Sequence, residues 1–470
     1  MINLKELTIT KAHGALIKKE YSCVDLAQTY LKQIENKNQE LNAYLGIYDD
    51  VIEQAKKADE MFADGKATMV TGIPFAIKDN ILYEGKVASG GSKILENYIA
   101  AYDATVIKKL KEAGAVILGR ANMDEFAMGG STENSAYGPS KNPNDLTRVP
   151  GGSSGGSAVT VAGDLALVSL GSDTGGSIRQ PASFCGIVGL KPTYGTVSRH
   201  GLMSMASSLD VIGPMTKTVE DAEIVFNVIK GKDKFDATSE EGELNKKEKY
   251  VIGVPRDFLK EGVDADVLEN FNQSVEKLRS QGFEIKDVSL PTLPYALAVY
   301  YIIMPAEVSS NLARFDGVKY GSLKEGKDLI EDYFLTRGEY FGKEARRRIM
   351  LGTYVLSTGY YDAYYGKALK VRELVKKDFE KVFKEVDAIV TPVSPMPAFK
   401  FGEKANDPLQ MYLADIFTVS ANLATVPAIS IPAGTVLREE KSLPVGLQII
   451  APRFGENILF EIGKKFEGSN

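Results

Sequence analysis

The chain has 470 residues, of which 44% are hydrophobic and 25% charged, a balance typical of a folded globular protein. Its net charge of -6 argues against binding nucleic acid unaided, because such binding depends on clustered Lys and Arg. Only two histidines (His13, His200) and two cysteines (Cys23, Cys185) occur, which disfavours a histidine triad, a metal site and a disulfide framework. Without a secretory signal or a membrane-spanning apolar run, we expect a cytoplasmic protein that does not cross a membrane.

The first part of the chain predicts helices and then an alternation of strand and helix. Residues 1–65 carry helical periodicity and predict a scaffold of two or three packed helices. Residues 73–77 predict a short strand with Lys78 at its carboxyl end, where ligands of α/β sheets tend to bind. Asp103 is expected to cap a helix that ends near Gly114, before a buried strand over 115–118.

The same alternation returns in the second half of the chain. Strands are predicted at 250–254, 388–391, 428–431 and 446–450, with helices between them, so the fold class is α/β. The charged, glycine-containing stretch 230–249 predicts a surface connection. A domain boundary there is an alternative, but periodic sequence on both sides favours a single domain over 1–470.

Two glycine-serine clusters dominate the middle of the chain. Between Gly151 and Gly201, 12 of 51 residues are glycine, and seven of these lie in the two clusters 151–157 and 171–177. A flexible linker is the simpler interpretation of one cluster, but each of these runs straight into apolar sequence. Neither continues into the Gly-Lys-Ser/Thr of a phosphate-binding loop, and a G-x-S-x-G elbow lacks its histidine. Glycines instead allow tight turns that aim serine hydroxyls and N–H groups at one point.

A serine nucleophile needs a base, and with so few histidines that base must be a lysine or a carboxylate. Lys78 is the candidate, because burial at a strand end weakens a lysine's preference for its charged form. The alternative is an ordinary surface lysine beside Asp79.

The motifs around these residues resemble the amidase signature family, whose catalytic set is a Ser, a second Ser with a cis peptide, and a Lys. The matching segments are Ala76–Asn80, Gly151–Ser157, Gly171–Arg179 and Gly189–Gly195. The resemblance covers nearly the whole chain and implies one large domain with a mixed central sheet flanked by helices on both faces. Within it, 70–215 is the catalytic core, and 250–470 supplies the second half of the sheet and substrate-binding helices.

The resemblance also implies roles for individual residues. Ser177 is the acyl-ester nucleophile, Ser153 relays its proton and Lys78 is the general base, with no metal. The remaining implied residues are an oxyanion hole formed by the N–H groups of Thr174, Gly175, Gly176 and Ser177, and supporting side chains from Ser154, Asp173 and Arg179.

Further segments are similar to the glutaminase subunits of tRNA-dependent amidotransferases: Ala206–Asp210, Asp236–Ser239, Pro305–Glu307 and Arg347–Ile349. That similarity implies glutamine hydrolysis, with ammonia passed on to convert Glu-tRNA(Gln) to Gln-tRNA(Gln), Asp-tRNA(Asn) to Asn-tRNA(Asn), or both. The implied assembly is a heterotrimer with subunits B and C, in which B meets the mischarged tRNA. No cofactor is expected in this chain, and ATP and Mg²⁺ are expected at the partner that meets the tRNA.

Free glutamine needs a cation for its carboxylate and an anion for its ammonium group. The matching positions are Arg348 and Asp415, with Tyr300 as a further polar contact; Arg347 and Tyr301 remain open alternatives. His200 and Thr425 depart from the family pattern, standing where an aromatic residue and a glycine are expected. A stand-alone amidase acting on another small or aryl amide is the competing function, and a non-catalytic scaffold is a third.

Overall fold

A single mixed β-sheet forms the centre of the molecule. The computed structural model describes residues 2–259, 262–404 and 408–468. Its 11-stranded sheet has the order β1-β3-β2-β4-β6-β5-β10-β11-β9-β7-β8, which confirms the expected mixed α/β architecture. The strands are β1 (Tyr44–Ile47), β2 (Pro74–Lys78), β3 (Val116–Ala121), β4 (Val168–Asp173), β5 (Val188–Lys191), β6 (Val211–Thr216), β7 (Val251–Val254), β8 (Glu284–Asp287), β9 (Ala388–Pro392), β10 (Ala428–Arg438) and β11 (Lys441–Ile450).

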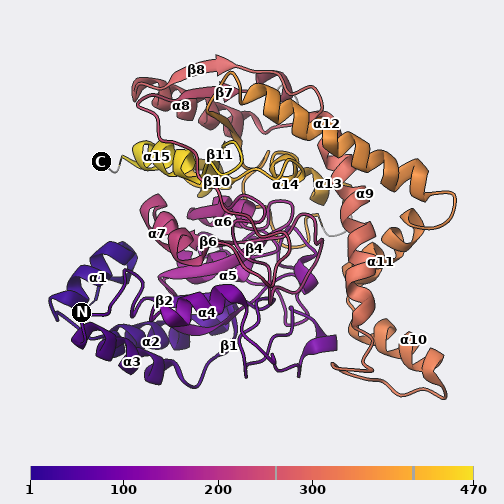
Figure 1. The fold of residues 1–470 in the computed structure, drawn as a ribbon, viewed down its shortest axis with the longest axis horizontal. Helices are drawn as coiled ribbons and strands as arrows, with labels where there is room; N and C mark the ends of the chain where they lie inside the picture. The colour runs from indigo at the N-terminus through magenta and orange to yellow at the C-terminus, as the bar shows by residue number, and fades with distance from the viewer. Residues whose placement is uncertain (1, 260–261, 405–407, 469–470) are drawn as a thin grey trace.

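Helices surround this sheet (Figure 1). They are α1 (Ile9–Ile17), α2 (Cys23–Leu41), α3 (Val51–Ala63), α4 (Thr105–Glu112), α5 (Gly155–Ala162), α6 (Arg179–Cys185), α7 (Val219–Ile229), α8 (Ala265–Ser280), α9 (Leu293–Asn311), α10 (Leu329–Tyr340), α11 (Lys343–Val355), α12 (Lys367–Val382), α13 (Pro408–Leu413), α14 (Val419–Leu423) and α15 (Glu456–Glu467). Short single turns complete the chain, including a π-helical turn at Tyr361–Gly366 (η6). Among the described residues, no helix has the length and apolar character needed to cross a bilayer.

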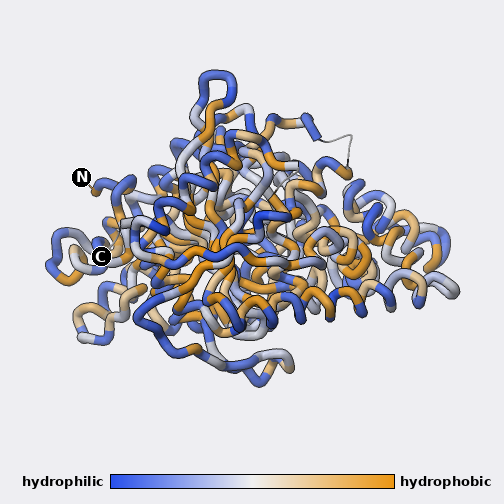
Figure 2. Tube along the Cα trace, turned by 90° about the horizontal axis from the view of Figure 1, so that it is seen from above, coloured by the Kyte–Doolittle hydropathy of each residue, from blue (hydrophilic) through white to orange (hydrophobic). Residues whose placement is uncertain are grey.

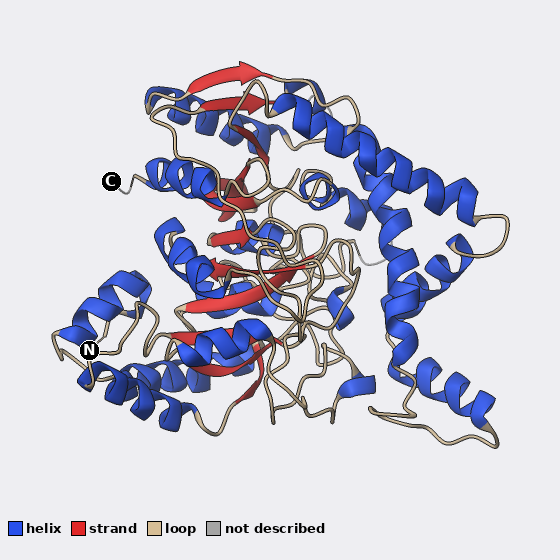
Figure 3. Cartoon of the chain, in the orientation of Figure 1, coloured by secondary structure: helices blue, strands red, loops and turns tan. Residues whose placement is uncertain are grey.

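The pairing of the central strands brings two catalytic segments together. β2 runs parallel to β4, with Phe75 opposite Val168 and Ile77 opposite Leu170. Since neighbouring parallel strands end at the same edge of a sheet, Lys78 and the loop after Asp173 emerge side by side. Loops gather at this end of the strands, and α9 and α11 stand across from them (Figure 3).

Burial of apolar side chains supplies the stabilisation of this core. Every residue of β2 and β4 is buried, and apolar residues colour the interior of the molecule in Figure 2. A second apolar cluster joins α9, α12 and α14, with Ile303 and Phe379 fully enclosed. This second cluster anchors the helices that face the catalytic loops.

The structure corrects several expectations about single elements. The amino-terminal stretch does form three packed helices, α1 to α3, but it also contributes β1, which was not expected. Asp103 is not the cap of α4: the cap position is Ala104, and Asp103 accepts hydrogen bonds from Glu84 N–H and from Lys111. The strands predicted at 428–431 and 446–450 extend further, because they join in the long β10–β11 hairpin.

The two departures from the family pattern both have a structural account. The ring of His200 stacks between those of Tyr102 and Phe235, with centroid distances of 4.9 Å to each, so it fills the place of an aromatic residue. Thr425 has a φ of 61°, in the left-handed region where glycine is favoured and a β-branched residue is strained. The stretch 230–249 connects strands of the same sheet as a loop, although its Asp236 is buried against Arg199.

Candidate active site

Lys78 lies fully buried at the end of β2, surrounded by serine hydroxyls. Its Nζ is 2.7 Å from Ser153 Oγ, 2.8 Å from Ser154 Oγ and 2.9 Å from Ser172 Oγ. Burial lowers the pKa of Lys78 to about 7, although nearby carboxylates, Asp124 foremost, act in the opposite direction. A sizeable fraction of this amine is therefore uncharged near neutral pH.

Four oxygen atoms lie within hydrogen-bonding distance of Lys78 Nζ: the three serine hydroxyls and Ser172 O, at 3.3 Å. Ser154 donates its hydroxyl hydrogen to Ser172 O at 3.0 Å, so its oxygen accepts from the amine. Ser172 Oγ already accepts from Asn80 Nδ2 at 3.0 Å and is the second acceptor for the amine. A neutral amine has two N–H donors and one lone pair. With Ser154 and Ser172 as its two acceptors, a neutral Lys78 can take a proton from Ser153, the third hydroxyl in contact with Nζ.

Ser153 is held by a closely packed loop. The Gly152–Ser153 peptide is cis, as the family resemblance implied. A side chain on Gly152 would collide with Ser131 N at 2.4 Å, so the loop approaches its neighbours too closely for any other residue. Asp124 braces the same region by accepting from Thr132 N–H and Asn134 N–H, each at 2.9 Å.

Ser177 lies just before α6 and is only partly buried, unlike Lys78 and Ser153. Its carbonyl accepts from Ser154 N–H at 3.2 Å, which ties the two glycine-serine clusters together. Within the described part of the chain its hydroxyl makes no hydrogen bond, so the Lys78–Ser153 link is formed and a Ser153–Ser177 link is not. A proton relay requires the Ser177 side chain to turn toward Ser153, a closure typical of catalytic hydrogen bonds when substrate enters.

The loop before Ser177 presents N–H groups at this site. Those of Thr174, Gly175 and Ser177 make no hydrogen bond to any described residue, so they remain available as oxyanion donors. Gly176 differs from the prediction: its N–H donates to Asp173 Oδ1 at 2.9 Å and is occupied. Its φ of 140° makes it the turn that lets its neighbours face the site.

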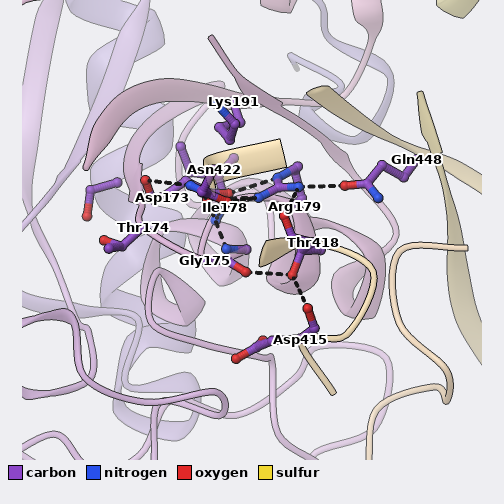
Figure 4. A network of polar contacts seen from close by, with 12 residues as sticks. Asp173, Thr174, Gly175, Ile178, Arg179, Lys191, Asp415, Thr418, Asn422 and Gln448 are labelled. Atoms are coloured by element: carbon purple, nitrogen blue, oxygen red, sulfur yellow. Dashed lines mark hydrogen bonds and ion pairs between the residues drawn. The ribbon is translucent and has the colours of Figure 1, made fainter. Parts of the chain in front are cut away.

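Asp173 and Arg179 form a fully buried ion pair beneath this loop (Figure 4). Arg179 Nη2 and Nε lie 3.0 and 3.1 Å from the two carboxylate oxygens. Burial by itself would raise the pKa of Asp173, but the guanidinium group of Arg179 outweighs it and lowers the value to about 2. The other donors of Arg179 reach Thr418 O, Gln448 Oε1 and Asn422 Oδ1, so all five are engaged.

The residues predicted to hold glutamine converge on the other side of the loop. Asp415 accepts a hydrogen bond from Tyr301 OH at 3.1 Å, and the ring of Tyr301 stacks on that of Tyr412 with a centroid distance of 3.7 Å. Burial raises the pKa of Asp415 to about 7, with Tyr301 and Arg348 opposing it. Arg348 is buried beside the Tyr301 ring, and its Nε donates to Glu344 Oε1 at 2.8 Å. The side chain of Arg347 is 46% exposed and pairs with the other oxygen of the same carboxylate. The inward position favours Arg348 over Arg347.

The sequence left open whether Tyr300 or Tyr301 makes the tyrosine contact, and the structure gives the two residues different contacts. The hydroxyl and ring of Tyr300 pack against Gly175, where a side chain would clash at 2.6 Å. Tyr301 is the one that bonds to Asp415. Tyr300 therefore packs against the loop before Ser177, and Tyr301 orients Asp415.

Sequence reasoning missed four residues of this arrangement: Ser172, Thr418, Asn422 and Gln448. Ser172 lay in the second glycine-serine cluster at the end of a predicted strand, so its position carried a usable signal. Thr418 Oγ1 donates to Gly175 O at 2.6 Å, a contact between segments too distant in the chain for a motif to reveal. Asn422 and Gln448 reach Arg179 across more than 240 residues of chain.

The known proteins that are similar to this chain agree with this geometry. The family model described as "Amidase" matches residues 25–460. The A subunit of glutamyl-tRNA(Gln) amidotransferase from Thermoanaerobacter pseudethanolicus is 53% identical over 100% of this chain and 97% of its own, and that of Carboxydothermus hydrogenoformans is 53% identical over 96% and 94%. The crystal structure of the same A subunit from Thermotoga maritima has a TM-score of 0.81 at 42% identity, covering 100% of this chain and 96% of that one. Peptide amidase from Stenotrophomonas maltophilia has a TM-score of 0.82 at 26% identity, with 99% and 97% covered.

Proposed function

The chain belongs to the amidase family, and on that premise we propose that it is the glutaminase subunit of a tRNA-dependent amidotransferase. The observation that carries this proposal is the buried amine of Lys78, with its pKa lowered to about 7 and its Nζ 2.7 Å from Ser153 Oγ, beneath a loop of unengaged N–H groups. Relatives of about half-identical sequence over nearly the full length, all named as the A subunit of glutamyl-tRNA(Gln) amidotransferase, support glutamine as the amide.

Catalysis starts with the uncharged form of Lys78. Ser177 Oγ attacks the carboxamide carbon of glutamine, its proton passes to Ser153, and the proton of Ser153 passes to Lys78 Nζ. The negative charge on the former carbonyl oxygen is stabilised by the N–H groups of Thr174, Gly175 and Ser177, each worth about 3 to 4 kcal/mol in such sites. The proton returns to the leaving nitrogen, ammonia departs, and water hydrolyses the γ-glutamyl ester of Ser177 to glutamate.

Recognition of free glutamine depends on the two opposite charges carried by its α-carbon, the carboxylate and the ammonium group. Arg348 pairs with the α-carboxylate, and Asp415, oriented by Tyr301, receives the α-ammonium group. An ammonium group beside Asp415 favours the ionised carboxylate, so substrate binding lowers the raised pKa of this residue.

The released ammonia then serves a second reaction on partner chains. Subunits B and C complete the proposed heterotrimer. B, which we call the acceptor subunit, binds the mischarged Glu-tRNA(Gln), with Asp-tRNA(Asn) as a second substrate to be tested. ATP and Mg²⁺ act at the acceptor subunit, where the carboxylate of the mischarged amino acid is activated. The cytoplasm, where aminoacyl-tRNA is used, is the proposed location, and the two free, buried cysteines are consistent with a reducing compartment.

Trapping the acyl intermediate tests the proposal. The heterotrimer is incubated with glutamine and hydroxylamine, and γ-glutamyl hydroxamate is measured. Ser177→Ala is expected to abolish both hydroxamate and ammonia release while the fold is retained. Ser183→Ala, the same change in the adjoining helix α6, is the control and keeps both activities. Undiminished ammonia release by Ser177→Ala would remove Ser177 from its role.

A substrate panel separates this function from a stand-alone amidase of the same family. Glutamine turnover that appears only with the partner subunits favours the amidotransferase. Rapid hydrolysis of unrelated small or aryl amides by the isolated chain favours the alternative.

A further inference from the structure

A carboxylate that the proposed mechanism does not use holds one edge of the Arg348 guanidinium group. Glu344 lies in the first turn of α11, four residues before Arg348, and its Oε1 accepts a hydrogen bond from Arg348 Nε at 2.8 Å. The side chains of Glu344 and Arg348 are 11% and 6% exposed. An exposed ion pair at this spacing contributes little to geometry or stability. This pair is buried, so water has little access to it and the Nε edge of the guanidinium group stays fixed.

The rest of the guanidinium group contacts two rings and one sulfur atom. Its central carbon lies 5.7 Å from the ring centroid of Tyr301 and 5.9 Å from that of Tyr412, both within the range of a cation–π contact. Nη1 donates to Met304 Sδ at 3.4 Å, and a thioether is a weak acceptor. Nη2 has no acceptor among the described residues. The edge formed by Nη1 and Nη2 is therefore left for a planar acceptor such as a carboxylate, which can bind both nitrogens.

Glu344 is shared by two arginines, and this decides the charge that the substrate meets. Arg347 Nη1 lies 2.7 Å from Glu344 Oε2, while Arg348 bonds to Oε1. Burial by itself would lower the pKa of Arg348, but the carboxylate of Glu344, foremost among the opposing groups, keeps it above its ordinary value. Arg348 therefore stays charged. Two guanidinium groups against one carboxylate leave a single positive charge, which matches the single charge of an α-carboxylate.

Resting on the function proposed above, we propose that Glu344 is a positioning residue for Arg348 and makes the site selective for amides that carry a free α-carboxylate. By fixing the Nε edge, it presents the Nη1–Nη2 edge to the substrate in the orientation that bidentate binding requires. Without Glu344 the guanidinium group loses this orientation, and the α-carboxylate loses a bidentate partner. Amides that lack the α-carboxylate gain nothing from Arg348, so Glu344 contributes to discrimination against them without touching the substrate.

Substitutions of Glu344, compared on two amides, test this role. The heterotrimer is assayed with glutamine and with 4-aminobutanamide, which is glutamine without its α-carboxylate. Glu344→Leu and Glu344→Ala both remove the acceptor, one at similar volume and one without added apolar surface, so a folding defect in one variant does not decide the result. Both are expected to raise KM for glutamine at least fivefold, with kcat within threefold of the wild type. Their kcat/KM for 4-aminobutanamide should stay within threefold, because this amide lacks only the group that Arg348 binds.

Two further variants separate positioning from a general structural role. Glu344→Gln keeps a carbonyl oxygen that can accept from Arg348 Nε, so its KM for glutamine is expected within threefold of the wild type. Glu373→Leu on α12 is the matched control: Glu373 pairs with Lys376 at 2.7 Å, but its side chain is 59% exposed. This control is expected to keep KM and kcat within twofold. Thermal unfolding of each free chain verifies that the variants remain folded.

The outcomes separate the role of Glu344 from the proposed function. If the folded Glu344→Leu and Glu344→Ala variants raise KM for glutamine less than fivefold, or lose kcat/KM equally on both amides, the positioning role is overturned and the proposed function stands. If Glu344→Gln is impaired as strongly as these two variants, the hydrogen bond to Arg348 Nε is not the basis of selectivity and the inference is wrong. If the wild-type heterotrimer releases no ammonia from glutamine, the proposed function itself fails, and the inference with it.

Discussion

Neutralising Asp173 tests how the catalytic loop is held in place. In Asp173→Asn only one carbonyl oxygen remains, so it can accept the hydrogen bonds of only one of the two former carboxylate oxygens. The new amide group then faces N–H donors, either those of Ile178 and Arg179 Nε or those of Gly176, Asn422 and Arg179 Nη2. Because Asp173 and Arg179 have no exposed surface, the guanidinium charge loses its counter-charge without gaining water.

Removing one partner of such a buried pair costs about 3 to 5 kcal/mol of unfolding free energy. We expect this loss for Asp173→Asn in urea-induced unfolding at pH 7, together with a fall in kcat of at least a hundredfold. The double variant Asp173→Asn/Arg179→Met removes the unpaired charge, and its loss is expected to be smaller than the sum of the two single losses. A destabilisation below about 1 kcal/mol for Asp173→Asn, or strictly additive losses, would refute the account of the loop.

Three further results are expected. The proposed mechanism requires Lys78 to be uncharged and Asp415 to be ionised, and burial places both pKa values at about 7. As pH falls below 6, log kcat/KM should therefore decline with a slope of two, and log kcat with a slope of one because Asp415 is then already paired to substrate. A slope of one in both profiles would contradict the assignment. Thr418→Val deletes the hydroxyl that donates to Gly175 O, so kcat should fall about tenfold with little change in KM, and an unchanged kcat would count against a positioning role. Thr425→Gly removes a β-branched side chain from a position with positive φ, so it should raise the unfolding free energy by about 1 kcal/mol in urea titrations. A decrease in the unfolding free energy would disprove backbone strain at this position.

The parts of the site that the sequence could predict are local in the chain. Glycine-serine clusters mark tight turns by composition, and a short apolar run before Lys78 marks a strand end, so both can be recognised without knowledge of the fold. The nearly complete absence of histidine narrowed the choice of base to lysine or a carboxylate. Fold class and family followed from the same segments.

The parts that could not be predicted depend on contacts between distant segments. Gly176 was grouped with its neighbours as an oxyanion donor, because nothing local shows that its N–H is taken by Asp173. The orientation of α11, which turns Arg348 inward and Arg347 outward, is decided by packing against α9. The strand β1 was missed because its four residues lie between two strongly helical segments and form only by pairing with β3.

The partners of Arg179 also have a consequence for synthesis on the ribosome. When Lys78, Ser153 and Ser177 have all been translated, the carbonyl of Thr418 and the side chains of Asn422 and Gln448 have still to be made. Until then, the guanidinium group of Arg179 has only Asp173 as a hydrogen-bond partner, so burial of the nascent loop remains unfavourable. Glutamine-hydrolysing competence is thereby tied to near-completion of the polypeptide, and a prematurely terminated chain would carry the reactive serines without a working enzyme.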